Sequence, residues 1–296
     1  MRIKHVNLTV TLLVLSGCQG QEKEPSLERT AAVVECLNER PAPVKLNAGL
    51  ATIGHDNSYP EERPVRTETV AAFEIDAHEV TNGQFKAFVE ATNFLTEAEK
   101  KQPGFDVPGG AVFTLPSAEN PSWWQFVEGA NWRHPEGPES SIDGRDMEPV
   151  VQVTLSDATA YAAWAGRRLP TEIEWEFAAK AGSDTRYIWG TERAPEGKEQ
   201  ANTWQGAFPI QNTAEDGFQA RAPIGCFSPN AFGLFDMVGN VWEWTDTGWG
   251  DGQSHVIKGG SFLCAENYCR RYTATSRQPQ EMNFSTNHIG FRTVGD

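Results

Sequence analysis

Residues Gly259-Gly260-Ser261-Phe262-Leu263-Cys264-Ala265-Glu266-Asn267-Tyr268-Cys269-Arg270-Arg271-Tyr272 form the most informative stretch of this chain, because they hold two closely spaced cysteines. A separation of five residues points Cys264 and Cys269 apart on a helix and to opposite faces of a strand. The thiols can therefore meet only if the backbone turns between them. Such a turn produces either a disulfide or a two-thiolate site for a soft metal. Composition alone favours the disulfide.

Length and composition indicate a soluble globular protein. The chain has 296 residues, of which 39% are hydrophobic and 22% are charged, enough for a sizeable core. Ten tryptophans occur, many of them in stretches with neither a helical nor a strand period, so we expect a loop-rich aromatic core. We see no linker and no internal repeat after about residue 40, which predicts a single domain over residues 40–296.

The charge pattern argues against nucleic acid as a partner. The formal net charge is −15, and no run of Lys and Arg suited to phosphate binding is present. This acidity favours solubility and is compatible with a basic peptide substrate.

The N-terminus has the pattern of an export signal. A short basic head precedes an apolar run that is too short to span a bilayer, and residues 15–18 read Leu-Ser-Gly-Cys, as in a bacterial lipobox. We predict a signal peptide over residues 1–17, lipidation of Cys18, and a polar tether over residues 18–39. The protein is then an exported lipoprotein on the periplasmic side or cell surface, with membrane contact only through its lipid. The alternative is an ordinary secretory peptide with a chance cysteine.

Export places the remaining cysteines in an oxidising compartment. The chain has five cysteines, and Cys18 accounts for the odd one. A bond between Cys36 and Cys226 that fixes the N-terminal segment to the core is one hypothesis, since sequence does not give connectivity.

Local patterns predict three helices and three strands. Capping-box patterns at Thr81 and Thr171, and a start at Ser156, open these helices. The helices are expected over residues 82–92, 156–166 and 172–181. The strands are expected over Thr69–Ile75, Val256–Gly260 and His288–Val294.

Periodicity largely vanishes between residues 183 and 255, and a loop this long needs something to hold it. Oxygen-bearing side chains in this stretch are candidates for Ca²⁺ ligands. They are Asn202, Asp216, Asp236 and Glu243. The alternative is that they are ordinary turn residues.

Several motifs occur in the order found in one known family. They are residues 79–85 (EVTNGQF), 168–176 (RLPTEIEWE), 212–218 (NTAEDGF), 239–244 (GNVWEW) and the closing 290–292 (GFR). Together with the cysteine segment, they resemble the formylglycine-generating enzyme (sulfatase-modifying factor) family over about residues 40–296. The resemblance implies a single α+β domain, related to C-type lectins, with little regular secondary structure.

The resemblance also implies a reaction. Members with both cysteines oxidise one cysteine in an unfolded sulfatase polypeptide, in a Cys-X-Pro-X-Arg segment, to Cα-formylglycine, with O₂ and a thiol reductant. Cys264 and Cys269 match the pair that holds Cu(I), and the substrate thiolate joins as a third ligand. Thiolates are soft ligands that suit Cu(I). Because the metal needs free thiolates, a Cys264–Cys269 disulfide is expected to be an inactive or resting form.

Further site residues follow from the same resemblance. Ser261 matches a catalytic position that hydrogen-bonds near the substrate sulfur or oxygen. Trp242, Tyr268, Arg271 and His288 match positions that line the substrate pocket, with plain packing as the alternative for Trp242 and Tyr268. Two structural Ca²⁺ sites are implied. The first comprises Asn202, Thr203, Asp216 and Phe218, and the second comprises Asp236, Gly239, Val241 and Glu243.

The chain departs from the family pattern at three positions. Ala265 stands where active enzymes often carry His, and His288 stands where the animal enzyme has Asn, which bears on substrate preference and turnover. Thr293 replaces a cysteine of vertebrate members, so one structural disulfide is missing. The histidine motif and extra helical domain of related iron-dependent sulfoxide synthases are not found in the sequence.

Two other functions remain open at this point. One is a non-enzymatic binding module on the same fold, with Cys264 and Cys269 joined as a structural disulfide. The other is a copper oxidase of the same type that acts on a different cysteine-bearing protein.

Overall fold

The computed structural model describes residues 35–102 and 104–296, which belong to one compact unit. The predicted signal peptide, Cys18 and most of the predicted tether lie outside the described residues. Within the described part, no helix is both long enough and apolar enough to cross a bilayer.

The three α-helices begin at capping boxes. They are α1 (Asn82–Thr92), α2 (Leu155–Trp164) and α3 (Glu172–Lys180). At α1, the Gln84 N–H donates to Thr81 Oγ1, and the Thr81 N–H donates to Gln84 Oε1. The start predicted at Ser156 is wrong, because α2 is capped by Thr154, whose partner in the box is Asp157. Three short 3₁₀ turns complete the helical structure of the described residues: η1 (Pro60–Glu62), η2 (Glu97–Glu99) and η3 (Pro195–Gly197).

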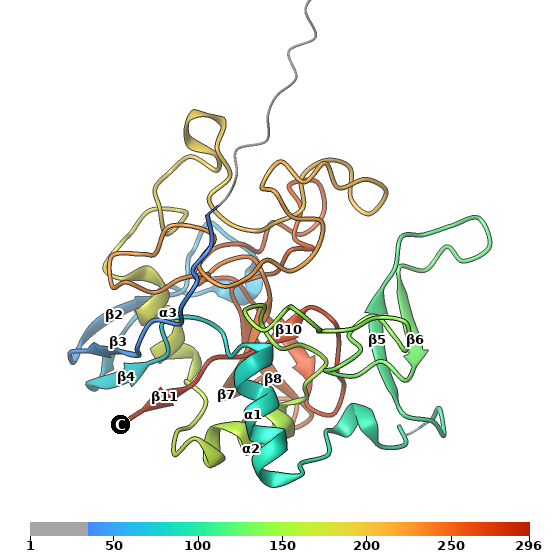
Figure 1. Ribbon diagram of the computed structural model, residues 1–296. Helices are drawn as coiled ribbons and strands as arrows, with labels where there is room; N and C mark the ends of the chain where they lie inside the picture. Colours follow the sequence, from blue (N-terminus) through green and yellow to red (C-terminus); the bar gives the residue numbers. More distant parts are fainter. Residues whose placement is uncertain (1–34, 103) are drawn as a thin grey trace, which may run out of the picture. The chain divides into compact units, whose positions relative to one another are not determined.

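The strands are short and form four small sheets (Figure 1). One sheet has the order β1-β4-β11, one has the order β10-β7-β8-β9, and the hairpins β2-β3 and β5-β6 stand alone. The strands are β1 (Val44–Leu46), β2 (Gly49–Ile53), β3 (Arg66–Val70), β4 (Phe73–Ile75), β5 (Gly109–Phe113), β6 (Trp124–Glu128), β7 (Trp242–Gly248), β8 (Ser254–Lys258), β9 (Arg277–Glu281), β10 (Ile289–Gly290) and β11 (Val294–Gly295). The fold is therefore the loop-rich α+β domain that the sequence predicts.

Two predicted strands are each divided between sheets. The strand expected over residues 69–75 is split, because β3 pairs with β2 whereas β4 pairs with β1 and β11. The strand expected over residues 288–294 is also split, because β10 runs parallel to β7 whereas β11 pairs with β4. A single straight strand cannot serve two separate sheets, so the chain bends between the two pairings.

The third predicted strand, over residues 256–260, corresponds to β8 but ends earlier. The backbone of Gly259 and Gly260 has φ values of +93° and +81°, which lie outside the β region. The stretch from residue 183 to 255 also contains β7, which the sequence did not predict.

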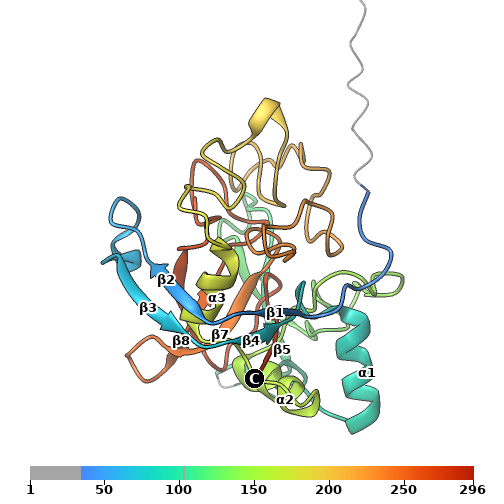
Figure 2. The same cartoon turned by 90° about the vertical axis from the view of Figure 1, so that its left-hand side faces the viewer.

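Helix α3 contacts strands of two sheets. It packs against the β2–β3 hairpin and against β7 and β8, and Figure 2 shows it between these elements. Its fully buried Trp175 lies in a cluster with Ile53, Ile75 and Leu234. This packing holds the start of the cysteine segment in place, because that segment follows β8 directly.

Two further hydrophobic clusters enclose the cysteine segment. The first contains the aromatic core around Phe85 and includes Cys264. The other contains Trp204 and Phe208 and includes the residues on either side of Cys264, namely Leu263 and Ala265. The Cys264 side chain therefore packs in a different cluster from those of its two neighbours.

Cys36 and Cys226 are joined by a disulfide, which confirms the pairing hypothesis. The bond closes a loop between residues 190 positions apart in the sequence. A cross-link over a long loop removes conformational freedom from the unfolded chain and typically contributes about 2–5 kcal/mol.

Removal of this bond is expected to destabilise the domain without altering the cysteine site. We expect the double variant Cys36→Ser, Cys226→Ser to lose about 2–5 kcal/mol in free energy of unfolding, measured by urea titration under non-reducing conditions. Wild type treated with a reductant serves as the control and is expected to show a similar loss. An unchanged urea midpoint in the double variant contradicts this role.

Candidate active site

Two glycines allow the cysteine segment to fold back on itself. Gly259 and Gly260 have positive φ values, which glycine adopts without the strain that a side chain brings. A Cβ atom on Gly260 would lie 2.0 Å from the carbonyl oxygen of Arg271, so no larger residue fits there. This close approach joins the two ends of the segment 260–271, and the backbone turns between the two cysteines.

The turn brings the two thiols together. The Sγ atoms of Cys264 and Cys269 lie 3.3 Å apart, and both cysteines are free. Ser261 is fully buried and makes two contacts with Cys264. Its N–H donates to Cys264 Sγ at 3.5 Å, and its carbonyl oxygen accepts from the Cys264 N–H at 2.9 Å. The Ser261 hydroxyl accepts a hydrogen bond from the Leu263 N–H, so it also stabilises the turn.

The two thiols differ in their acidity. Burial, reinforced by the neighbouring Cys269 thiolate, raises the pKa of Cys264 well above its ordinary value. The hydrogen bond from Cys264, together with Arg271, lowers the pKa of Cys269 to about 6. The pair therefore holds one proton near neutral pH, with the negative charge on Cys269.

Arg271 provides the positive charge beside Cys269. Its Nη1 atom lies 3.9 Å from Cys269 Sγ. Its position is fixed by an ion pair with Glu61, at 2.5 Å, and by the ring of Tyr59, whose centroid is 4.0 Å from the guanidinium carbon. Both partners come from the segment around η1, which the sequence did not associate with the site.

The thiols face a cavity of about 310 Å³. All the predicted catalytic and pocket residues line it: Ser261, Cys264, Cys269, Trp242, Tyr268, Arg271 and His288. The structure adds residues that the sequence did not identify: Trp123, Trp124, Phe208, Leu263 and Gln278. The adjacent tryptophans at 123 and 124, in a polar stretch, were a sequence signal for an aromatic surface.

His288 lines the cavity with an uncharged ring. Burial lowers its pKa to about 3, so the ring is uncharged at neutral pH. Its Nδ1 atom lies 2.7 Å from Thr286 Oγ1, and its ring packs against Trp124 at 4.8 Å. The two aromatic residues predicted for the pocket differ, since Trp242 is almost fully buried whereas Tyr268 is exposed at the rim and stacks on Phe208.

A second cavity of about 340 Å³ adjoins the first and shares Trp124, Gln278 and His288 with it. Its lining is largely apolar and includes the stacked rings of Phe105 and Phe126. The two cavities therefore meet at these three residues, and the thiols lie in the first of them.

The residues of the first predicted calcium site fit a cation. Asp216 is buried, and burial raises its pKa to about 6 although it accepts hydrogen bonds from Thr203, Gln205 and Phe218. The Oδ1 atom of Asn202 is buried without a hydrogen-bond partner. A buried carboxylate and an unpartnered carbonyl oxygen suit a hard cation such as Ca²⁺.

The residues of the second predicted site have other partners. Both carboxylate oxygens of Glu243 accept hydrogen bonds from Arg292, and Trp175 Nε1 donates to the same group. The unpartnered oxygen here is Glu79 Oε2, on a fully buried carboxyl group whose pKa is raised by burial and by Asp236 and Glu243. In residues 35–102 and 104–296, no three His, Cys, Asp or Glu side chains are placed to hold one ion. Calcium binding at both sites therefore stays a prediction.

The contact of Arg271 with Cys269 generates a testable pH dependence. In the reduced, metal-free protein, Arg271→Gln removes a positive charge from the thiolate and is expected to raise the Cys269 pKa by about one unit, equivalent to about 1.4 kcal/mol. The measurement is the pH dependence of alkylation of Cys269, followed by mass spectrometry of its peptide. Arg66→Gln is the control, because it removes the same charge from a residue that pairs with Glu68 and does not line the cavity. Identical alkylation midpoints in wild type and Arg271→Gln contradict this role.

Calcium is expected to stabilise the fold through the first site. Addition of Ca²⁺ at about 100 times its Kd contributes about 2.7 kcal/mol, which corresponds to a rise in Tm of about 5–10 °C for a domain of this size. Asp216→Asn is expected to lose most of this rise, whereas Asp184→Asn, at an exposed position, keeps it. Calorimetry with Ca²⁺ and with a chelator provides the test, and an equal rise in Asp216→Asn and wild type argues against the site.

Comparison with known proteins gives relatives over most of the chain. A curated relative from Mycobacterium tuberculosis, named formylglycine-generating enzyme, is 44% identical over 86% of this chain and 97% of its own length. A relative from Bos taurus, named inactive C-alpha-formylglycine-generating enzyme 2, is 37% identical over 97% of this chain and 95% of its own length.

The fold has a counterpart among solved structures. The structure of PvdO from Pseudomonas aeruginosa matches 86% of this chain and 94% of its own, with a TM-score of 0.63 and 26% sequence identity. The family model described as the sulfatase-modifying factor enzyme 1-like domain matches residues 29–296. The motifs, the fold and these matches agree, and the chain belongs to the sulfatase-modifying factor family.

Proposed function

We propose that this protein oxidises a cysteine in a Cys-X-Pro-X-Arg segment of an unfolded sulfatase polypeptide to Cα-formylglycine. The observation that carries this proposal is the pair of free thiols 3.3 Å apart that line a cavity. Family membership alone is insufficient, because the relatives include a protein named inactive. The resemblance associates activity with the presence of both cysteines, and in this protein the two thiols are free and adjacent.

The overall reaction requires a reductant as well as O₂. The substrate side chain R–CH₂–SH becomes R–CHO, and sulfur leaves as H₂S. One O₂ supplies the aldehyde oxygen and one molecule of water. Two electrons and two protons complete the balance, and two external thiols supply them as they form a disulfide.

The donor set at the thiols fits Cu(I). Two thiolate sulfurs are soft ligands that favour this ion over hard cations. Cys264 and Cys269 would hold it, and when bound it supplies the activation of O₂ that closed-shell thiols lack. A Cys264–Cys269 disulfide removes both ligands, so it corresponds to an inactive or resting form.

Side chains around the two cysteines position the thiols and stabilise charge at them. Arg271 stabilises negative charge at Cys269, and the buried Ser261 fixes the position of Cys264. The neutral His288 and the indoles of Trp124 and Trp242 line the cavity beside the sulfurs and give it an uncharged surface there. Hydrogen bonds near the substrate sulfur or oxygen are the proposed role of Ser261.

The two adjoining cavities support an extended polypeptide as the substrate. One holds the thiols, the other holds the stacked rings of Phe105 and Phe126, and His288 lines both. A folded protein does not present a cysteine to such cavities, whereas an unfolded segment can occupy both. The formal net charge of −15 favours the approach of a basic segment.

We further propose that the protein is exported and attached to the membrane through a lipid on Cys18, with the catalytic domain on the periplasmic side or cell surface. The lipobox pattern supports this location. The Cys36–Cys226 disulfide is consistent with an oxidising compartment.

The test is conversion of a peptide. We expect Cu-loaded wild type, with O₂ and a thiol reductant, to convert a peptide that contains Cys-X-Pro-X-Arg. Mass spectrometry is expected to show the loss of one sulfur and two hydrogens and the gain of one oxygen, together with reactivity towards an aldehyde probe. Cys264→Ser and Cys269→Ser are each expected to reduce the rate by at least about a hundredfold, because each removes a metal ligand.

Two controls separate this function from its alternatives. A peptide with Ser in place of the target Cys is expected to give no product. Binding of one Cu(I) per chain, abolished by either Cys→Ser change, excludes the binding module with a structural disulfide. Absence of conversion by the wild type, despite bound Cu(I), excludes sulfatase segments and leaves an oxidase that acts on another cysteine-bearing protein.

A further inference from the structure

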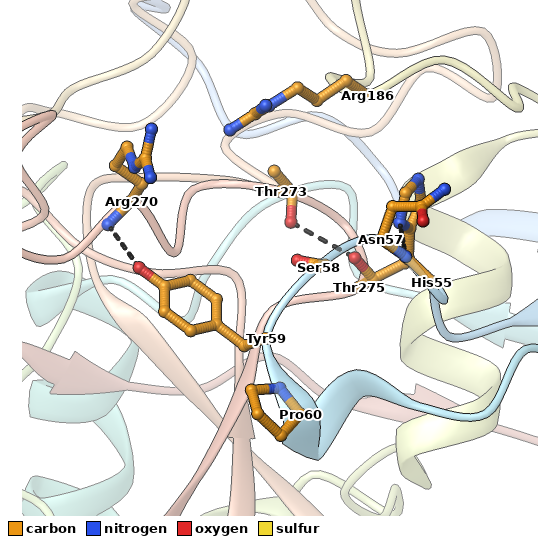
Figure 3. Close-up of a pocket in the computed structure, with 9 residues that line it drawn as sticks. All are labelled: His55, Asn57, Ser58, Tyr59, Pro60, Arg186, Arg270, Thr273 and Thr275. Atoms are coloured by element: carbon orange, nitrogen blue, oxygen red, sulfur yellow. Dashed lines mark hydrogen bonds between the residues drawn. The ribbon is translucent and has the colours of Figure 1, made fainter.

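A separate cavity of about 430 Å³ lies outside the cysteine site and shares no lining residue with it. Three segments build it: the loop at residues 55–60, Arg186 in the loop after α3, and residues 270–275, which directly follow Cys269 (Figure 3). Its volume is within the range of small-molecule sites, which is about 300–1,000 Å³.

The charge of this cavity is opposite to that of the whole protein. Arg186, Arg270 and His55 line it, and among the described residues no Asp or Glu side chain does. The chain as a whole has 40 acidic residues and a net charge of −15. In Figure 3, the guanidinium groups of Arg186 and Arg270 lie on one side of the cavity, and His55 and Asn57 lie on the other.

The polar groups of the cavity are mainly donors. The N–H of Asn57 donates to His55 Nδ1 at 3.1 Å, so in the neutral ring the proton is on Nε2, which is left to donate. The Thr275 hydroxyl donates to Oε2 of the buried Glu62 at 2.5 Å, whereas Glu62 Oε1 is buried without a hydrogen-bond partner. The ring of Tyr59 and Pro60 add apolar surface, which suits an organic ligand better than a bare ion.

The nearby acidic groups leave the arginines available. Glu266 contacts Arg270 Nη1 at 3.4 Å, but the two side chains are 60% and 51% exposed, and exposed pairs of this kind are weak. Asp56, Asp184 and Lys180 line an adjoining cavity of about 260 Å³, which shares His55, Asn57, Arg186 and Thr275 with the first. Arg186 is exposed, and its guanidinium lies 5.5 Å from the ring of Tyr187.

We infer that this cavity is a binding site for a small organic anion with two negative groups, such as a dicarboxylate or a phosphorylated carboxylic acid. The guanidinium groups of Arg186 and Arg270 bind one negative group through charge-assisted hydrogen bonds. His55 and Asn57 bind the other from the opposite side, and Tyr59 and Pro60 contact the body of the ligand.

The proposed anion site is connected to the thiols through the protein. The Arg270 N–H donates to the Tyr59 hydroxyl at 3.3 Å, and the Tyr59 ring supports the Arg271 guanidinium, which contacts Cys269. A ligand seated on Arg270 and Tyr59 therefore touches the segment that positions Cys269. The inference does not depend on the proposed oxidation, because binding is measured without it.

Calorimetric titration of the full chain provides the test, with succinate and 2-phosphoglycolate as probes. We expect saturable binding of at least one of them, and no binding of succinamide, which is uncharged. Arg186→Gln and Arg270→Gln are each expected to weaken binding by about tenfold or more, because each removes a charge-assisted contact. Arg66→Gln is the matched control, since Arg66 pairs with Glu68 on β3, does not line the cavity, and its loss changes the net charge equally.

Three results overturn the inference. They are the absence of binding by either probe up to about 10 mM, unchanged affinity in Arg186→Gln, and a preference for acidic peptides with no binding of the small anions. If Arg270→Gln disturbs the loop that carries Cys269, Arg186→Gln decides alone, because Arg186 is exposed and remote in sequence from that loop.

Discussion

The close contact between Gly260 and the Arg271 carbonyl is the constraint on which the site depends. The side chains of cysteines five residues apart do not meet in a regular helix or strand. The chain must therefore fold back on itself, and the contact between Gly260 and Arg271 holds the two ends of this loop together. Two further backbone hydrogen bonds hold this closed loop: the Phe262 N–H donates to Asn240 O, and the Trp204 N–H donates to Cys264 O. Both partners lie in loops, so the thiols are positioned by irregular structure that must itself be fixed.

Buried polar groups fix those loops. The amide of Asn240 is fully buried and bonds to Asn202, Ala222 and Glu79, three residues far apart in the sequence. The ion pair between Glu243 and Arg292 connects β7 to the C-terminal segment in the same way. Buried ion pairs contribute little net stability against an apolar alternative, but removal of one partner is costly. In this fold the buried polar groups select one arrangement of the loops, because hydrophobic contacts alone do not determine that arrangement.

The sequence predicted the parts of this fold that are governed by local interactions. Capping boxes at Thr81 and Thr171 located two helices, because such a cap depends on residues three positions apart. The strands were predicted poorly, because most are short and their limits depend on which distant strand pairs with them. The structure brings the catalytic and pocket residues named from the family resemblance to one cavity, and their roles stay predictions. Their supports, Tyr59 and Glu61, were missed because they lie some 200 positions away in the sequence and reach Arg271 only in the folded chain.

The difference between the two thiols connects the architecture with the proposed copper chemistry. In the metal-free protein, Cys264 and Cys269 share one proton and carry one negative charge, which Arg271 partly balances. Loss of this proton to solvent would leave two adjacent thiolates, one of them buried, which is electrostatically unfavourable. Replacement of the proton by a monovalent soft cation keeps the charge of the site unchanged. A divalent cation would instead bring the charge of the pair to zero, so that Arg271 would lose the negative charge at Cys269 that it balances. Burial makes Cys264 a poor acid, and the same burial favours a monovalent soft ion between the two sulfurs. The preference for a monovalent ion therefore depends on Arg271 and on burial as much as on the thiolates themselves.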